Sequence, residues 1–267
     1  MVTQSATTFN SVYGPVDSWR YGRSLGIDPI GSISACSFNC VYCQLGEIEH
    51  KTRDRRVFIP TEQIIQDLQP FAPWDVDVIT LSGSGEPTLA LNLGEILASI
   101  QELTHKSVVV LTNGTLLADL SVRQVLAIAD RVSVKLDAVS PEQLRRVNRP
   151  VAGMTLEGLY AGLQQFRTEF SGELALQTMM LSPWDESTRA EYIRSLQVLR
   201  PNEIQLNTPT RPKPLQHELE ARGNHSRSAE RPYPTRTLRG VRADVLQAFA
   251  AEIQAATGIP ARCPPVL

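Results

Sequence analysis

Residues 107–137 read SVVVLTNGTLLADLSVRQVLAIADRVSVKLD, and this stretch decides the fold that we predict. Two runs rich in β-branched residues, 107–112 and 131–137, lie on either side of a helical pattern. Within that pattern, Ser121-Val122-Arg123-Gln124 resembles a capping box, which starts many helices. A strand, a helix and a second strand in this order form the unit of parallel sheets with right-handed crossovers.

The same unit recurs along the chain. Helix-start signals stand at Thr61, at Asn92-Leu93-Gly94-Glu95 and at Ser140-Pro141-Glu142-Gln143. Six such units fall short of the eight in a closed barrel, and a doubly wound sheet would give the same order of elements. The predicted strands lie at 29–34, 76–82, 107–112, 131–137, 173–180 and 203–207.

Alternation within the strands favours the barrel. In 131–137 every second residue is apolar, and the others are Ser133, Lys135 and Asp137. The stretch 203–207 divides in the same way. Parallel strands buried on both faces are continuously apolar, so a polar second face indicates a lumen that holds water or a ligand. We therefore predict an α/β fold, a partial (β/α)6 barrel of the TIM type.

The chain divides by composition near residue 210. We place the barrel at 1–210, with core strands from about residue 30, and a short C-terminal extension at 211–267. Residues 211–240 hold seven Lys and Arg against three acidic residues, with four prolines, which is typical of a basic loop. A helix is predicted at about 241–256.

The overall composition excludes several classes of protein. The chain has 267 residues, 42% of them hydrophobic and 20% charged, with a formal net charge of −2. This apolar fraction argues against disorder, and the near-neutral charge argues against a surface that binds nucleic acid all over. No apolar run reaches the length of a membrane span and the N-terminus has no signal-peptide pattern, so we expect a cytoplasmic protein.

Three of the four cysteines, Cys36, Cys40 and Cys43, lie in one predicted loop, and Cys263 stands alone. A disulfide framework spreads its cysteines along the chain, so this clustering indicates a metal site. Three thiolates in a CxxxCxxC loop can hold three irons of a 4Fe–4S cluster and leave the fourth open. The alternatives are a redox thiol pair, or zinc with His50 or Cys263 as fourth ligand. Otherwise Cys263 has no predicted role.

A second motif follows the second predicted strand, where residues 82–88 read SGSGEPT. Glycines there let the backbone approach a ligand closely, Pro87 fixes the turn, and Glu86 offers a carboxylate. Alone, this motif could be a tight turn between a strand and a helix. Its place one βα unit after the cysteine loop makes the pair specific.

With both motifs in view, the sequence resembles the radical SAM (S-adenosylmethionine) superfamily. CSFNCVYC is similar to the cluster motif of that superfamily and SGSGEP to its GGEP-type motif, with Ser84 in place of a glycine. The resemblance implies a partial (β/α)6 barrel and a 4Fe–4S cluster whose open iron binds SAM. It also implies an enzyme that reductively cleaves SAM to a 5′-deoxyadenosyl radical, which abstracts hydrogen from a substrate. An external one-electron donor of the flavodoxin or ferredoxin type would supply the electron.

Further motifs resemble a subgroup of small Fe–S oxidoreductases related to the tRNA wyosine (imidazoG37) synthases. Those synthases carry a second cluster or a flavin module, for which this chain lacks the cysteines and the length. The motifs are Gly22-Arg23-Ser24-Leu25-Gly26-Ile27-Asp28, Thr112-Asn113-Gly114-Thr115, Asn148-Arg149-Pro150 and Asn207-Thr208-Pro209-Thr210-Arg211-Pro212.

The resemblance also implies roles for individual residues. Cys36, Cys40 and Cys43 would hold the cluster, Tyr42 would border the adenine of SAM, and Gly83, Ser84, Gly85 and Glu86 would meet its methionine end. Lys135 and Asp137 are candidate catalytic residues, and the alternative is that they form a buried ion pair. The remaining predicted contacts to SAM are Asn113, Ser133, Gln177 and Asn207.

The substrate is left open by the sequence, with a nucleic-acid base as the first candidate. Basic residues cluster in 51–56, 145–149 and 211–240, and together they could bind RNA phosphates. They could equally be separate solvated faces. The competing function is a non-enzymatic zinc or Fe–S module that binds RNA.

Overall fold

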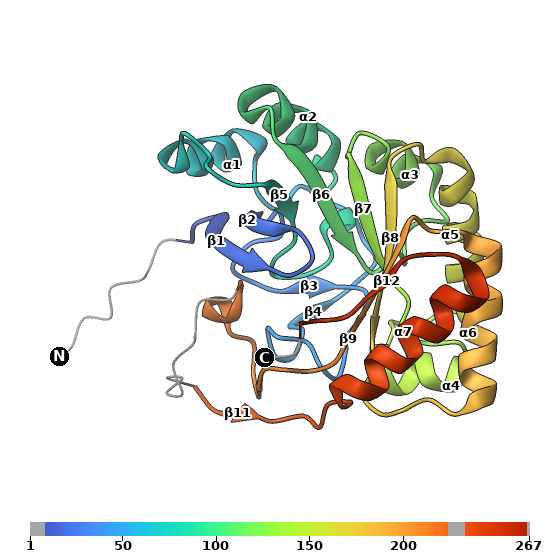
Figure 1. The fold of residues 1–267 in the computed structure, drawn as a ribbon. Helices are drawn as coiled ribbons and strands as arrows, with labels where there is room; N and C mark the ends of the chain where they lie inside the picture. Colours follow the sequence, from blue (N-terminus) through green and yellow to red (C-terminus); the bar gives the residue numbers. More distant parts are fainter. Residues whose placement is uncertain (1–8, 224–232, 266–267) are drawn as a thin grey trace.

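The structure is a computed structural model that describes residues 9–223 and 233–265. Its main sheet has eight strands in the order β1-β2-β5-β6-β7-β8-β9-β12 (Figure 1). β1 (Val12–Ser18) runs antiparallel to β2 (Gly22–Ile27), and all later neighbours are parallel. The other strands are β5 (Val78–Leu81), β6 (Ser107–Thr112), β7 (Arg131–Lys135), β8 (Glu173–Met179), β9 (Glu203–Asn207) and β12 (Ala261–Arg262).

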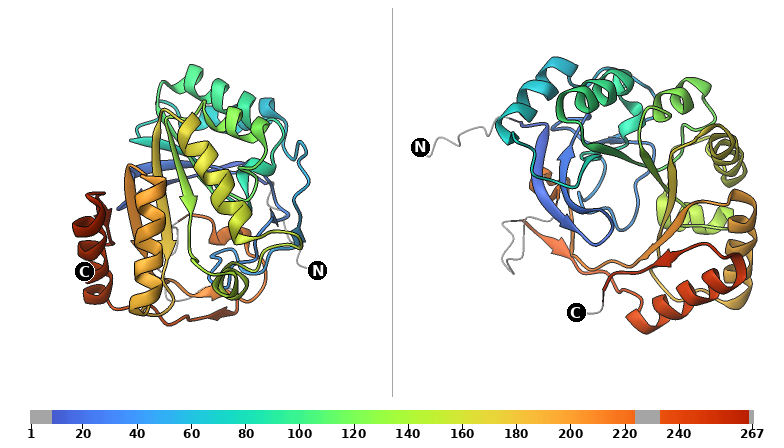
Figure 2. Two further views of the ribbon diagram at one scale, coloured as in Figure 1. Left: turned by 90° about the vertical axis from the view of Figure 1, so that its right-hand side faces the viewer. Right: turned by 45° about the horizontal axis from the view of Figure 1, so that its top comes forward.

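The sheet curves into an open arc with helices along its outer face, so the predicted partial barrel is confirmed (Figure 2). The helices are α1 (Thr61–Leu68), α2 (Leu93–Thr104), α3 (Leu120–Leu126), α4 (Pro141–Gln143), α5 (Leu156–Glu169), α6 (Glu186–Leu199) and α7 (Ala243–Thr257). No helix among the described residues is long and apolar enough to cross a membrane.

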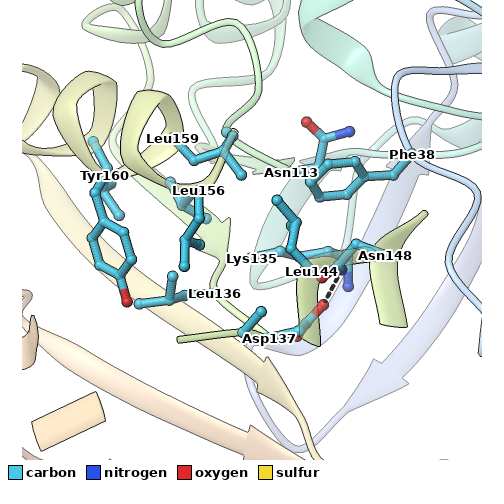
Figure 3. Close-up of a pocket in the computed structure, with 14 residues that line it drawn as sticks. Phe38, Asn113, Lys135, Leu136, Asp137, Leu144, Asn148, Leu156, Leu159 and Tyr160 are labelled. Carbon is cyan, nitrogen blue, oxygen red and sulfur yellow. Dashed lines mark hydrogen bonds between the residues drawn. The ribbon is translucent and has the colours of Figure 1, made fainter. Parts of the chain in front are cut away.

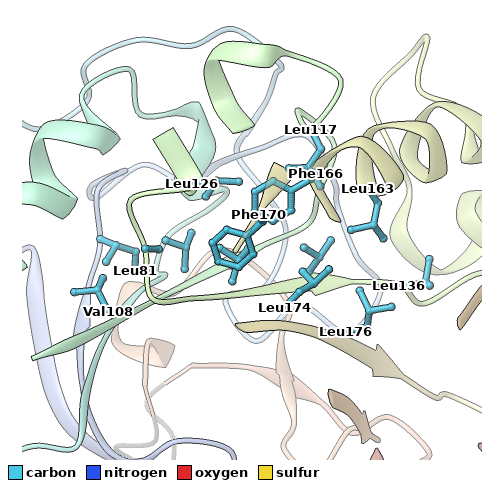
Figure 4. Packing of buried hydrophobic residues seen from close by; sticks show 14 of the residues in the cluster. Leu81, Val108, Leu117, Leu126, Leu136, Leu163, Phe166, Phe170, Leu174 and Leu176 are labelled. Atoms are coloured by element: carbon cyan, nitrogen blue, oxygen red, sulfur yellow. The ribbon is translucent and has the colours of Figure 1, made fainter. Parts of the chain in front are cut away.

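The main hydrophobic core fills the space between the sheet and these helices. Phe166, in α5, stacks on Phe170, which directly follows the helix, and their ring centroids are 4.8 Å apart. Figure 4 shows them beside Leu174 and Leu176 of β8, both fully buried. Each such side chain contributes about 1.5–3 kcal/mol when it leaves water. Because the apolar face of β7 and of β9 is used in this core, their polar faces are left to line the lumen, while Val78 of β5 and Val109 of β6 form a separate apolar cluster with Tyr21.

The first predicted strand, at 29–34, is wrong. The chain already runs through the sheet at β2, and a turn follows it, in which the Asp28 carboxylate accepts the N–H groups of Ile30 (3.0 Å) and Gly31 (3.3 Å). Gly31 has a φ of +111°, which glycine adopts readily. The turn contains two β-branched residues, Ile30 and Ile33, a residue type typical of strands.

Two of the predicted helix starts also differ in detail. α3 is capped by Asp119, whose carboxylate accepts the Ser121 N–H at 2.8 Å, so Ser121 is not the cap. Asn92 precedes α2, but its side-chain amide donates to Ile59 O and Thr61 Oγ1 instead of capping the helix. Ser140 caps α4 as predicted, by accepting the Gln143 N–H.

The C-terminal extension is joined to the barrel. The predicted helix is present as α7, and β12 after it pairs with β9. The arginine of that strand, Arg262, donates to Trp19 O (2.9 Å) and Arg20 O (3.1 Å) in the β1–β2 turn. Residues 213–214 (β10) pair with 235–236 (β11). The part of the predicted basic segment at 224–232 lies outside the described residues.

Candidate active site

The cysteine loop is held between two backbone segments. It begins in the short strand β3 (Ala35–Cys36), which pairs with β4 (His50–Lys51), and Thr52 N–H donates to Cys36 O at 3.1 Å. On its other side the loop pairs with the π-helical turn Leu144–Asn148 and the residues after it. The hydrogen bonds there are Asn39 N to Asn148 O (2.9 Å), Val41 N to Val147 O (2.9 Å) and Val151 N to Ser37 O (3.0 Å).

The glycine-rich loop is joined directly to the cysteine loop. Ala35 N–H donates to Ser84 O (3.1 Å), and Glu86 N–H donates to Ala35 O (2.9 Å). A Cβ on Gly85 would lie 1.7 Å from Ala35 O, so only glycine fits there. The two predicted motifs therefore form one backbone unit at the carboxyl end of β5, beside Cys36.

The carboxylate of Glu86 orders this unit. It accepts hydrogen bonds from the Thr88 N–H and hydroxyl, from the Thr112 hydroxyl (2.6 Å) and from the Asn113 N–H (2.7 Å). Burial raises the pKa of Glu86, and these donors oppose that shift. The carboxylate thus ties the end of β5 to the end of β6. Contact of Glu86 with SAM stays a prediction.

The three sulfurs lie among hydrogen-bond donors. Cys36 Sγ accepts from Phe38 N (3.4 Å) and from Asn113 Nδ2 (3.5 Å), and Cys40 Sγ accepts from Asn148 Nδ2 (3.5 Å). Such donors stabilise thiolates and tune Fe–S clusters. The predicted ligands therefore fit a cluster.

Burial raises the pKa of all three thiols, that of Cys40 to about 12. For Cys43, the Leu45 N–H and the charges of Lys213 and Lys135 oppose the shift. Positive charge thus faces Cys40 and Cys43, while at Cys36 the charge of Glu86 adds to the effect of burial and only the Phe38 N–H opposes it.

A single zinc ion fits this geometry less well. Within residues 9–223 and 233–265, no three His, Cys, Asp or Glu side chains converge as the ligands of one ion do. His50 is exposed on β4, and Cys263 packs against the main core instead of the cysteine loop.

Tyr42 and Asp137 are joined at the end of β7. The Tyr42 hydroxyl donates to Asp137 Oδ2, which also accepts from Asn148 Nδ2 at 2.7 Å, while Asp137 Oδ1 accepts the Met179 N–H at 2.7 Å. Burial, and then the charge of Asp137, raise the pKa of Tyr42, which keeps it a phenol that can donate.

Lys135 lies with its Nζ 5.1 Å from the centre of the Tyr42 ring, a cation–π contact. None of the ion pairs among the described residues joins Lys135 to Asp137, so the alternative of a buried ion pair is not what the structure contains.

A pocket of about 370 Å³, including its open mouth, lies beside these residues. Figure 3 shows Leu156 and Leu159 on one side of it and Phe38 and Asn113 on the other, with Asp137 bonded to Asn148. Apolar walls with a few convergent polar groups are typical of small-molecule sites. The polar groups among its lining residues include Asn113, Lys135, Asp137 and Asn148.

Ser133 and Gln177 lie deeper in the lumen. Tyr21, from the β1–β2 turn, hydrogen-bonds to Ser133 Oγ and lies 3.3 Å from Gln205 Oε1, which accepts from Gln177 Nε2 at 2.9 Å. This polar network fills the lower lumen, where a ligand or water was expected. The predicted contacts of Ser133 and Gln177 to SAM stay predictions. Asn207 is half-buried at the end of β9, and its Oδ1 accepts the Thr208 N–H.

Sequence reasoning missed two residues that organise the site. Asn148 donates to both Cys40 and Asp137. It stands in the Asn148-Arg149-Pro150 motif, which supported the family resemblance but did not indicate what Asn148 does. Asp28 accepts the Ser84 N–H (2.9 Å) and hydroxyl (2.6 Å). The sequence Asp28-Pro29 predicts a turn, but it cannot predict the contact with Ser84, because Ser84 is 56 residues away along the chain.

Two of the basic clusters lie at the cysteine loop. Lys51 ends β4, the strand that pairs with β3, and Arg53 follows it, while 147–151 pair with the loop itself. Lys51, Arg53, Arg145 and Arg149 are exposed. Four exposed basic side chains therefore lie on the segments that flank the cysteine loop.

Comparisons with known proteins agree with this geometry. The family description "Radical SAM superfamily" matches residues 30–196. The UPF0026 protein slr1464 of Synechocystis sp. is 60% identical over 260 residues, 97% of this chain and 98% of that protein. A probable GTP 3′,8-cyclase of Saccharolobus islandicus is 33% identical over 128 residues, 48% of this chain and 40% of its own length.

Among solved structures, Streptococcus suis SuiB bound to S-adenosylmethionine superposes with a TM-score of 0.59 at 13% identity. The match covers 88% of this chain and 52% of SuiB, so the chain spans about half of that protein, and the likeness is one of fold. The chain therefore belongs to the Radical SAM superfamily, enzymes that use a 4Fe–4S cluster and SAM, and within it to the UPF0026 proteins.

Proposed function

We propose that Cys36, Cys40 and Cys43 hold a 4Fe–4S cluster with one iron open to SAM. The observation that carries this proposal is the backbone pairing of Ala35 with the Ser84–Glu86 turn. It puts the first cysteine beside the glycine-rich loop that would receive the methionine end of SAM. When bound, a reduced cluster supplies the electron that splits SAM into methionine and a 5′-deoxyadenosyl radical, which abstracts hydrogen from a substrate.

The residues of the chain would hold and shield this chemistry. Asn113 donates to Cys36 and Asn148 to Cys40, and Gly83, Ser84, Gly85 and Glu86 would meet the methionine end of SAM. Tyr42 would border the adenine, and Asn113, Ser133, Gln177 and Asn207 remain the proposed polar contacts to SAM. The apolar walls of the pocket would exclude water. Lys135, beside the Tyr42 ring, would make an electrostatic contact.

Anaerobic reconstitution tests the proposal. The wild-type chain should take up about four irons and four sulfides and, once reduced by dithionite, release 5′-deoxyadenosine from SAM. Replacing Cys36, Cys40 or Cys43 by Ser should abolish both properties, while Cys263→Ser should keep both. A preparation that binds one zinc ion and never cleaves SAM would overturn the proposal.

For the substrate we propose a nucleic-acid base, which is the substrate class of the wyosine synthases that the sequence resembles. Exposed Lys51, Arg53, Arg145 and Arg149 around the cysteine loop support a phosphate-bearing ligand. The name of the probable GTP 3′,8-cyclase indicates that this relative acts on GTP. GTP has a purine base and phosphates, as RNA does. Membership of an enzyme superfamily favours this reading over a non-enzymatic RNA-binding module.

RNA binding by SAM-loaded, oxygen-free protein tests the substrate class. Arg145→Gln and Arg149→Gln should each weaken binding and reduce its salt dependence by about one unit. Arg131→Gln is a matched control, because Arg131 begins β7 at the opposite end of the strand. Equal loss in all three variants, or binding that salt does not weaken, would count against a phosphate-bearing substrate. A flavodoxin or ferredoxin that replaces dithionite would identify the proposed electron donor.

A further inference from the structure

The segment 213–222 lies on the cysteine loop, and we call it the strap. It runs from β10 through the short helical turn Leu219–Ala221, outside the residues that match the superfamily. Its Glu218 N–H donates to Leu45 O at 2.9 Å. A Cβ on Gly46 would lie 1.8 Å from Gln216 O, so the two backbones are in direct contact three residues after Cys43.

The first basic side chain of the strap reaches the cysteine motif through a carboxylate. Lys213 Nζ lies 2.7 Å from Glu47 Oε1, and Glu47 Oε2 accepts from Asn39 Nδ2 at 2.6 Å. Asn39 immediately precedes Cys40 and also accepts the Ile48 N–H. Lys213 thus holds the Glu47 carboxylate, which in turn holds Asn39 in the middle of the CxxxCxxC loop.

The last basic side chain of the strap reaches the glycine-rich motif in the same way. Arg222 Nη1 lies 2.9 Å from Asp28 Oδ2, the oxygen that accepts both donors of Ser84. Arg222 also donates to Asn10 O and stacks over the rings of Phe9 and Tyr13. The Asp28 side chain is 0% exposed, so this pair is screened from solvent.

A third contact has the same form and lies between the other two. His217 Nδ1 is 3.0 Å from Glu49 Oε2, which accepts the Ser34 N–H at 2.9 Å. Ser34 stands two residues before Cys36. Three times, therefore, a side chain of the strap contacts a carboxylate that accepts from the cysteine loop, from the glycine-rich loop or from Ser34 just before the cysteines, which one isolated surface ion pair would not explain.

We propose that Lys213 and Arg222 are positioning residues, which set the cysteine loop and the glycine-rich loop respectively for cluster and SAM. This inference rests on the proposed function of those loops. Because the two residues act on different motifs, replacing them has separable effects. A strap that only stabilised the fold would weaken both sites together.

The Lys213 arm is measured on the cluster-free protein. In Lys213→Met, iodoacetamide labelling of Cys40, read by mass spectrometry against Cys263, should rise about threefold, since the pair of buried Lys213 with half-exposed Glu47 is lost. Iron retention after reconstitution should fall, and Lys213→Arg should restore both values. Labelling that is unchanged, or that Lys213→Arg does not restore, would overturn this arm.

The Arg222 arm is measured on reconstituted enzyme. Arg222→Met should raise the KM for SAM at least about tenfold with normal iron content, because a buried carboxylate loses its cation. Arg189→Met is the matched control, since it breaks a 2.8 Å pair with Glu252 between α6 and α7. A KM like that of the control, or a parallel loss of iron and SAM affinity, would overturn the proposal.

The two arms also separate this inference from the proposed function. If the wild-type chain takes up no cluster, the proposed function fails, while the labelling pattern of the cluster-free protein still tests whether Lys213 orders the loop. If the wild-type chain cleaves SAM and both variants behave like Arg189→Met, only the strap proposal fails.

Discussion

At the scale of single residues, Asp137 joins three segments of the candidate site. Its two oxygens accept from Tyr42, Asn148 and the Met179 N–H, and none of these contacts needs a bound ligand. In Asp137→Asn, one oxygen becomes an NH2 group that faces either the Met179 N–H or the Asn148 amide. Leaving such a buried donor unpaired should cost about 1–3 kcal/mol in unfolding free energy.

Chemical denaturation measures that cost, and SAM cleavage at the same temperature shows whether activity falls further. A role in catalysis predicts that Asp137→Asn loses activity while it remains folded. If activity only follows the folded fraction, Asp137 is structural.

Gly85 gives a second prediction at this scale. In Gly85→Ala the new Cβ would lie 1.7 Å from Ala35 O. Because the Cβ is fixed to the backbone of one loop and Ala35 O belongs to the backbone of the other, only a shift of the backbone could relieve the clash. We expect a loss of at least about 2–3 kcal/mol, the upper range for overpacking, together with loss of iron binding. Gly158→Ala in α5 is the control, because its nearest neighbour is 3.4 Å away and alanine favours the helix. Iron binding by Gly85→Ala equal to wild type would show that the motifs are not coupled here.

At the scale of elements, most strands could be predicted closely, and β6 and β9 have the predicted bounds. A run of β-branched residues marks β6 and alternating apolar residues mark β9, and both patterns are local properties of the sequence. The two-residue strand β12 could not be predicted, because only its pairing with β9 makes it a strand. The same holds for the site: the three cysteines could be named from spacing, but the contacts of Asn148, Asp28 and the strap depend on tertiary structure.

The cap of α3 carries an element-scale prediction with a pH dependence. Hydrogen bonds from the Ser121 hydroxyl and N–H lower the pKa of Asp119, so the folded state holds the ionised form more tightly than the unfolded chain does. The stabilisation is therefore present above the unfolded pKa of about 3.9 and is lost as the pH falls through the lower folded value. Asp119→Ala should cost about 1 kcal/mol at neutral pH.

Thermal unfolding across pH checks this prediction. The difference in Tm between wild type and Asp119→Ala should shrink in acid. Asp119→Asn keeps an acceptor without a titrating group, so its difference from wild type should follow the same titration, while its difference from Asp119→Ala should not change with pH. A difference for Asp119→Ala that stays constant down to low pH would mean that the ionised cap contributes nothing.

At the scale of the whole molecule, the C-terminal residues close the open side of the half-barrel. Arg262 bonds the β1–β2 turn at one end of the strands, and Arg222 bonds Asp28 at the other. The strap lies between β9 and α7, so both of its flanks are anchored in the fold. In Figure 2 the orange segment follows this open side. Docking of α7 should thus belong to the same cooperative unit as the barrel.

Phe249 tests that coupling. It is 2% exposed in α7, and its ring centroid lies 5.8 Å from those of both Trp184 and Tyr192, which bring α6 and the loop before it into the same cluster. Phe249→Ala should lower the free energy of unfolding by about 3–5 kcal/mol. The transition should stay single when near-UV and far-UV circular dichroism are compared, because losing α7 exposes the edge of β9 and releases the strap. Gln247→Ala, on the exposed face of the same helix, should change stability by at most about 0.5 kcal/mol. Two separate transitions in Phe249→Ala would show that α7 and the strap are an independent unit, and the closure of the half-barrel would then have to come from β1 and β2 alone.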